Sequence, residues 1–133
     1  MANGSYCDDP SIPDHANLWR RIPPGWWVLD ENLGRLRPTS AAFDDHRNGT
    51  PMSVLIADVV FSTGRGPTDI LARFKGYAMA SIKAGVAREC SLGVIREPLP
   101  EEPAHAVVFG KKTKGVRAKL ATNCEWVVDP PHP

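Results

Sequence analysis

The sequence predicts a single α+β domain, with a mixed or antiparallel sheet of short strands and two or three helices. Its 133 residues are the length of one ordinary domain. Its 13 prolines and 11 glycines interrupt the chain too often for long helices. Short runs of β-branched and aromatic residues are interleaved with helical-period segments, without regular strand–helix–strand spacing. Together these features favour the α+β class.

The folded domain is expected over residues 16–129, between a flexible N-terminal segment (1–15) and a C-terminal tail (130–133). The N-terminal segment is polar and interrupted by prolines. It lacks a basic stretch followed by an apolar one, so we expect no secretory signal. No apolar run in the chain is long enough to span a bilayer, so we expect no membrane partner.

Charge and cysteine content narrow the compartment and the partners. The formal net charge is +1, so any nucleic-acid partner must be met by a local basic patch. The three cysteines, Cys7, Cys90 and Cys124, include no close pair. A disulfide framework and a CxxC-type zinc site are therefore not expected, and free thiols in a cytoplasmic protein are.

Hydrophobic patterning places the elements. Strands are expected at residues 17–22, 26–29, 52–57, 94–95, 104–109 and 125–128. The first of these segments also fits a single helical turn. A helix is expected over residues 69–75, with Thr68 as its N-cap and Gly76 as its stop, and a second over residues 113–124. Residues 77–90 fit either a helix or an alternating strand, and the sequence leaves both open.

A single histidine, His105, lies on an otherwise apolar expected strand. Its neighbours Ala104 and Ala106 are small and would leave room around the imidazole. Histidine changes charge near neutral pH, so His105 could act as a general acid–base group or bind a ligand. The alternative is a half-buried histidine that is hydrogen-bonded to the backbone, and both interpretations stay open.

A basic turn (residues 110–117) follows this strand and opens the expected helix. Five positive side chains occupy nine positions: Lys111, Lys112, Lys114, Arg117 and Lys119. The turn does not match the phosphate-loop pattern GxxxxGK[ST]. Its charges and the helix N-terminus could still hold a phosphate or an acidic partner, unless they are simply a solvated helix face. About 17 Å of strand separates His105 from this turn, so a small ligand could use only one of the two.

A third group surrounds residues 35–46. Arg35 and Arg37 share one strand face and could form a fork onto a phosphate or carboxylate. Ser40 has small neighbours, so a ligand could approach it closely. The run Asp44-Asp45-His46 fits no metal-binding pattern and is typical of a turn, so we expect no bound metal.

Two adjacent arginines, Arg20 and Arg21, lie on the first expected strand. Neighbours in a strand point to opposite faces, so at least one of them faces the packed side of the sheet or a cleft. A half-buried arginine needs a partner. The carboxylates expected to supply it are Glu89, Asp30 and Asp58.

Three segments resemble those of short bacterial proteins: Leu18-Trp19-Arg20-Arg21, Arg37-Pro38-Thr39-Ser40-Ala41-Ala42-Phe43 and Glu102-Pro103-Ala104-His105-Ala106. The chain also resembles, more loosely, ADP-ribosyltransferase-like folds, which include toxins that degrade NAD. That resemblance implies an arginine or histidine on an early strand and a serine or aromatic residue on a following one, and gives these parts to Arg20 and Ser40. The chain lacks the family's clear late-strand glutamate, for which Glu125 is a poor match.

The leading hypothesis is a small bacterial cytoplasmic binding or interaction module, with a site for a nucleotide, a nucleic acid or an acidic protein partner. Its expected ligand-binding residues are Arg37, Lys111, Lys112, Lys114 and Arg117. One alternative is an enzyme that acts on a nucleotide or phosphoester, with His105, Ser40 and Arg20 as catalytic residues. Another is a subunit of a larger assembly. No cofactor is expected.

Overall fold

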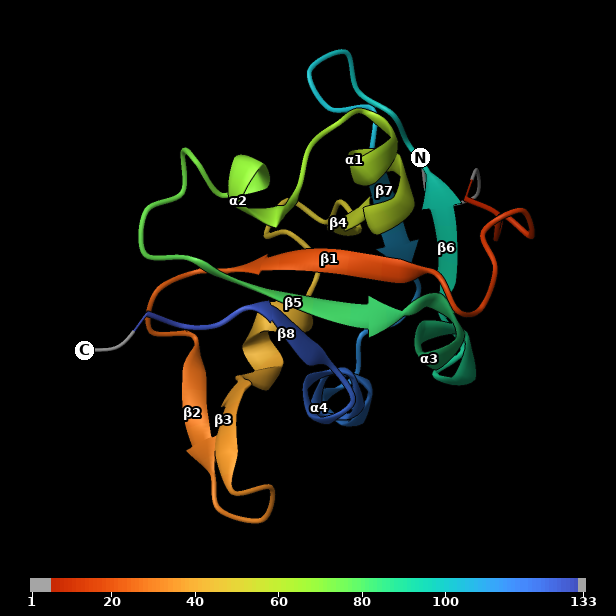
Figure 1. Cartoon of the computed structure of the whole chain (residues 1–133). Helices are drawn as coiled ribbons and strands as arrows, with labels where there is room; N and C mark the ends of the chain where they lie inside the picture. Colours follow the sequence, from red (N-terminus) through yellow and green to blue (C-terminus); the bar gives the residue numbers. More distant parts are fainter. Residues whose placement is uncertain (1–5, 132–133) are drawn as a thin grey trace.

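An antiparallel six-stranded sheet forms the centre of the fold in the computed structural model, which describes residues 6–131 (Figure 1). From one edge to the other its strands are β6 (Gly93–Arg96), β7 (His105–Phe109), β4 (Met52–Ile56), β1 (Asn17–Ile22), β5 (Ala78–Lys83) and β8 (Glu125–Val128). Every described pairing is antiparallel. The expected α+β class is therefore confirmed.

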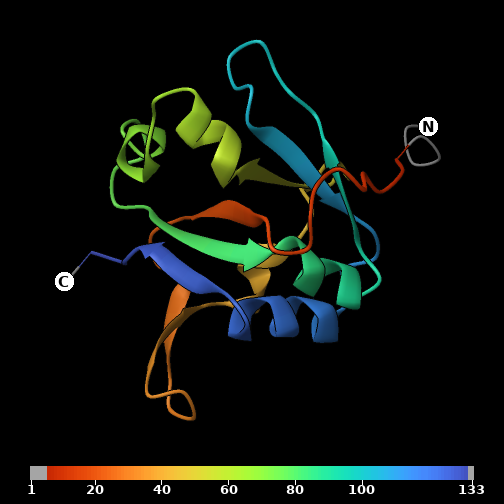
Figure 2. The same ribbon diagram turned by 45° about the vertical axis from the view of Figure 1, so that its right-hand side comes forward.

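Helices cover both faces of this sheet (Figures 1 and 2). The described α-helices are α1 (Ala57–Ser62), α2 (Pro67–Ile70), α3 (Ala84–Glu89) and α4 (Lys114–Thr122), with a 3₁₀ turn η2 (Ser40–Phe43). The larger apolar core lies between the sheet and the side that carries α3, α4 and η2. The smaller one lies under α1 and α2, around Trp19, Leu55 and Met79. The second face is thus only partly covered, and it leaves room for a cleft.

Residues 77–90, which fitted either a helix or a strand, contain one of each. The first half of this segment is β5, in which Ala78, Ala80 and Ile82 alternate into the larger core, and the second half is α3. Gly85 lies in the first turn of α3, where an added Cβ would come within 3.0 Å of Asp14. Close approach of the N-terminal segment explains why this helix begins with a small residue.

The helix expected over residues 69–75 was wrong. The helical turn α2 begins earlier, at Pro67, and the Asp69 carboxylate accepts a hydrogen bond from the Gly66 N–H at 2.8 Å. Proline is well suited to a first helical position because it has no N–H to leave unpaired. Helix α4, by contrast, begins as expected, with the Thr113 hydroxyl accepting from the Val116 N–H.

The N-terminal segment makes specific contacts from Tyr6 on. Asp9 N donates to Val94 O at 2.8 Å, and Ile12 is only 1% exposed. Arg88 forms ion pairs with Asp8 and Asp14. Residues 6–15 therefore contribute to the core, while residues 1–5 of the segment lie outside the described part of the chain, as do residues 132–133 of the tail.

A separate hairpin, β2 (Trp27–Asp30) and β3 (Arg35–Pro38), projects from the body (Figure 2). Its base is attached to β8, because Trp27 packs edge-to-face on Trp126 and the Trp126 indole N–H donates to Leu36 O at 3.1 Å. Most of the exposed large apolar side chains belong to it or its flanks: Trp26, Val28, Leu29, Leu33 and Leu36.

Two further findings concern the membrane and the thiols. No helix among residues 6–131 has the length and apolar character needed to cross a bilayer. The three cysteines are free: Cys7 is exposed, Cys90 is half-buried and Cys124 is buried. Burial raises the pKa of the Cys124 thiol to about 11, so it is protonated at neutral pH and behaves as a small apolar side chain.

Candidate functional site

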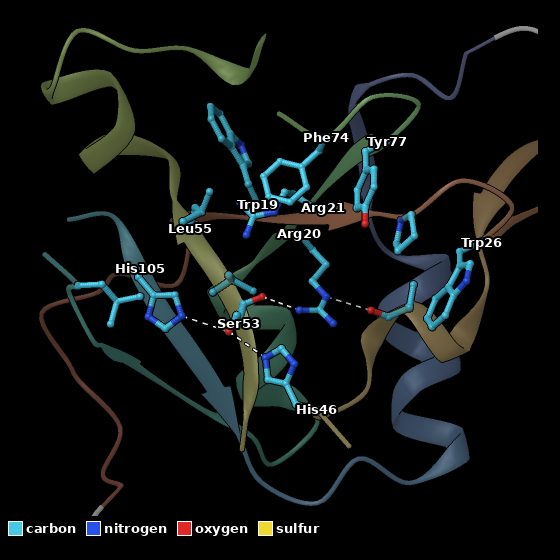
Figure 3. Close-up of a pocket in the computed structure, with 14 residues that line it drawn as sticks. Trp19, Arg20, Arg21, Trp26, His46, Ser53, Leu55, Phe74, Tyr77 and His105 are labelled. Atoms are coloured by element: carbon cyan, nitrogen blue, oxygen red, sulfur yellow. Dashed lines mark hydrogen bonds between the residues drawn. The ribbon is translucent and has the colours of Figure 1, made fainter. Parts of the chain in front are cut away.

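A cleft of about 440 Å³ opens on the less covered face of the sheet (Figure 3). It lies where β1 and β4 separate: β1 pairs with β5 at six positions but with β4 only at Leu18 and Trp19. The lining residues are Trp19, Arg20, Arg21, Pro23, Trp26, Ala42, His46, Ser53, Val54, Leu55, Phe74, Tyr77, Leu99 and His105. The expected catalytic residues Arg20 and His105 are therefore brought together here.

One serine hydroxyl lies between two histidines in this cleft. Ser53 Oγ is 3.1 Å from His105 Nε2 and 3.1 Å from His46 Nε2 (Figure 3). His105 Nδ1 is 2.8 Å from Glu97 O, a carbonyl oxygen that can only accept, so Nδ1 carries the proton. In the neutral ring Nε2 then accepts from the Ser53 hydroxyl, and Ser53 Oγ accepts from His46 Nε2–H.

The antiparallel register explains why Ser53 and His105 meet. Leu55 of β4 is directly opposite His105 of β7, and Ser53 is two residues from Leu55 on the same face. Diagonal neighbours across an antiparallel pair are close enough for side chains to touch. His105 is thus half-buried and hydrogen-bonded to the backbone through Nδ1, as one alternative expected, while its Nε2 meets the Ser53 hydroxyl.

His46 is delivered from a loop that the basic turn holds. Lys112 Nζ, with a side chain only 1% exposed, donates to Asp45 Oδ1 at 2.7 Å and to Val108 O at 2.8 Å. Arg117 pairs with Asp44 at 2.9 Å. Asp44 and Asp45, the two residues that precede His46, are therefore anchored to the start of α4.

Arg20 spans the gap between β1 and β4. Its guanidinium donates to Ser53 O at 2.8 Å and to Ala42 O at 3.0 Å, with a longer contact to Asp44 O at 3.5 Å. The carboxylate partners expected from the sequence were wrong, because backbone carbonyl groups of β4, of η2 and of the residue after η2 accept instead. Burial, with a contribution from neighbouring Arg21, lowers the pKa of Arg20 to about 10, so it stays charged at neutral pH.

Arg21 points into the cleft from the opposite face of β1. Its guanidinium carbon lies 4.4 Å from the centre of the Phe74 ring, a cation–π contact. Burial lowers the pKa of Arg21, opposed by Glu102 and Tyr77. Among residues 6–131 no acceptor hydrogen-bonds this guanidinium and no carboxylate pairs with it. Its donors are therefore available to a ligand.

A second cavity of about 260 Å³ shares Arg21, Leu55, Phe74, Leu99 and His105 with the first. Its wall contains a two-pronged ion pair, in which the Arg65 guanidinium donates to both carboxylate oxygens of Glu102 at 2.7 Å. Arg65 is thereby occupied. Arg21 lies where the two cavities meet and feels the charge of Glu102, but among residues 6–131 it has no hydrogen-bond acceptor of its own.

The other expected site residues lie outside the cleft. Ser40 begins η2, and Arg37 of β3 pairs with Asp30 at 2.7 Å. Lys112 and Arg117 pair with Asp45 and Asp44, while Lys111 and Lys114 are exposed. The list of cleft residues contains none of these six.

Sequence reasoning missed Ser53, His46 and Glu97 as site residues. The available signal for Ser53 was one polar residue within the apolar run 52–57. Nothing in the sequence indicated that Ser53 would meet His105, because that histidine lies 52 positions further along the chain.

Neither a metal site nor a relative adds to this description. In the described part of the chain, no group of three or more His, Cys, Asp or Glu side chains is arranged to hold a metal ion. No family model, curated protein or solved structure matches the chain. The side chains of the cleft are therefore the basis for the functional conclusion.

Proposed function

We propose that the cleft binds a small anionic ligand that carries an aromatic ring, for which a nucleotide is the best-fitting class. The observation that carries this proposal is Arg21: a charged guanidinium stacked on Phe74, facing the cleft, with no described partner for its donors. Arginine donors form a planar fork that matches phosphate and carboxylate oxygens.

The rest of the cleft suits the same ligand. A volume of about 440 Å³ is within the range of small-molecule sites. Four aromatic side chains line it, Trp19, Trp26, Phe74 and Tyr77, and nucleobases stack on such rings. Arg20 adds a second positive charge near Ser53, and two histidines add polar contacts. Anion and ring are thus both accommodated in one cavity.

Ligand titration tests the proposal. AMP, ADP, NAD⁺ and a short RNA are titrated into the full chain at low and high salt, followed by tryptophan fluorescence and calorimetry. We expect a mononucleotide to bind, and Arg21→Gln to weaken its binding about 10-fold, because a charged hydrogen-bonding partner is lost. Arg35→Gln, an exposed arginine of β3, is the matched control and should leave the affinity unchanged.

The outcomes separate the related hypotheses. If none of the ligands binds the native chain, or if the two arginine variants behave alike, the proposal is wrong. Tighter binding of RNA than of AMP, with a steep salt dependence, would favour the nucleic-acid version. Release of nicotinamide from NAD⁺ would favour an ADP-ribosyltransferase-like activity.

A further inference from the structure

Ser53, His105 and Glu97 are connected in the order of a nucleophile, a base and a group that orients the base. The Ser53 hydroxyl donates to His105 Nε2 at 3.1 Å, and His105 Nδ1–H donates to Glu97 O at 2.8 Å. This is the arrangement by which a weak hydroxyl nucleophile is activated on many unrelated folds. The imidazole is fixed in the tautomer that can accept the serine proton.

Two further groups lie beside this pair. The Glu97 carboxylate lies 3.6 Å from His105 Nδ1, on the side of the ring opposite the nitrogen that takes the proton. His46 Nε2–H donates to Ser53 Oγ at 3.1 Å. Once Ser53 Oγ has bonded to a carbonyl carbon, this N–H can turn from Oγ to the carbonyl oxygen, where negative charge develops.

The position of the histidines distinguishes carbonyl from phosphorus chemistry. In displacement at phosphorus, the leaving oxygen departs in line, on the side opposite the nucleophile. Both histidines instead lie 3.1 Å from Ser53 Oγ, on the nucleophile's side. At a carbonyl the leaving alcohol departs from a tetrahedral centre beside the base, so one histidine can take and return the proton.

We propose that Ser53 is the nucleophile, and His105 the general base, of a hydrolytic site for carboxylic esters that carry an anionic group and an aromatic ring. The ester chemistry rests on Ser53 and His105 alone. The anionic and aromatic character of the substrate rests on the proposed function of the cleft, with Arg21 as the anion's partner.

The reaction balances without a cofactor. Ser53 Oγ attacks the carbonyl carbon while its proton passes to His105 Nε2. The imidazolium then gives that proton to the alcohol oxygen as the ester C–O bond breaks, which leaves an acyl group on Ser53. Water next loses a proton to His105 and attacks the acyl carbon, and the proton returns to Ser53 Oγ as the acid departs.

A fluorophosphonate probe tests the nucleophile directly. Its fluoride leaves without needing a proton, so an activated serine forms an Oγ–P bond whatever its natural substrate. We expect the native chain to gain one adduct, mapped by mass spectrometry to Ser53 and formed much faster than on any other described serine. His105→Gln should slow this labelling at least about 100-fold, because the base is lost.

Controls keep the test independent of folding defects. Ser81→Ala, at a half-buried strand serine outside the cleft, should label at the native rate. Mapping of the adduct on the native chain needs no variant, so a variant that fails to fold leaves this part of the test valid. Absence of an adduct on native Ser53, or equal labelling rates for native chain and His105→Gln, would overturn the proposal.

Substrate probes separate this inference from the proposed function. Two 4-nitrophenyl esters are compared, one with a carboxylate in its acyl part and one without. We expect Arg21→Gln to lower kcat/KM about 10-fold for the anionic ester only. Labelling of Ser53 without any anionic preference would remove the role of Arg21 and keep the nucleophile. Nucleotide binding without labelling of Ser53 would keep the binding role of Arg21 and remove the nucleophile. Cleavage of bis(4-nitrophenyl) phosphate but of neither ester would overturn the carbonyl chemistry.

Discussion

The basic turn and the cleft both carry positive side chains, yet they use them differently. In the basic turn, Lys112 is buried and its ammonium group is taken up by Asp45 and two carbonyl oxygens, and Arg117 is paired with Asp44. In the cleft, Arg21 rests on an aromatic ring and keeps its donors free of described partners. The density of charge along a sequence therefore says little about which charges a ligand can reach.

The same contacts give the basic turn a structural task at a distance. Its ion pairs with Asp44 and Asp45 anchor the loop in which His46 lies, and His46 contacts Ser53. The two regions are thus connected: one holds the loop in place, and the other has the side chains that face the cavity. Three variants test this division of roles.

The largest effect is expected for Lys112→Met. It removes an ammonium group that donates to Asp45 Oδ1, Val108 O and Gly110 O, and leaves the Met52 N–H as the remaining donor to Asp45 Oδ1. We expect the free energy of unfolding to fall by about 3 kcal/mol, at the lower end for a broken buried ion pair because the Asp45 side chain is 33% exposed. Urea denaturation measures it. Lys111→Met, at the exposed neighbour, should change stability by less than about 0.5 kcal/mol, and equal losses would contradict the structural role of Lys112.

A smaller, pH-dependent effect is expected for Glu102→Gln at the cleft wall. Two hydrogen bonds from Arg65 hold the pKa of the Glu102 carboxyl below its ordinary value of 4.5, with burial opposing them. Because its pKa is lowered on folding, ionised Glu102 stabilises the protein above pH 4.5, and this contribution is lost as the pH falls through the folded-state pKa.

Denaturation curves of the native chain and Glu102→Gln should therefore differ by about 1 kcal/mol at pH 7 and converge below pH 4.5. Glu101→Gln, at an exposed neighbour, is the control and should differ little at either pH. A gap that persists unchanged at low pH would show that Arg65 does not depend on the charge of Glu102.

The smallest effect is expected for the double variant Lys111→Gln/Lys114→Gln. Both side chains are exposed, and neither lines the cleft. We expect the affinity for AMP to change by less than about 2-fold, because salt screens the exposed charges of these lysines from a ligand bound in the cleft. Titration calorimetry checks this value. A loss of 10-fold or more would instead place the anion on the basic turn, as the sequence first suggested.

Local patterns predicted much of the fold and part of the site. The strands that contain Arg20 and His105 were expected from local composition, and the helix after Thr113 from the helical spacing of its apolar residues. Ser40 was chosen as the catalytic serine because its neighbours are small. The structure places Ser53 in the cleft instead, since only strand register decides which serine faces which histidine.

The amino-acid sequence alone determined the α+β class, the main strands and the presence of a histidine on an apolar strand, because these depend on periodicity and composition over a few neighbouring residues. Tertiary structure alone decided that β1 and β4 separate past Trp19 and that Ser53 lies between His46 and His105. It also decided that Lys112 forms an ion pair with Asp45, while Arg21 rests on an aromatic ring with no described hydrogen-bond partner. The physical reason is that hydrogen bonds and ion pairs form between side chains close in space, and strand pairing brings together residues some 50 positions apart.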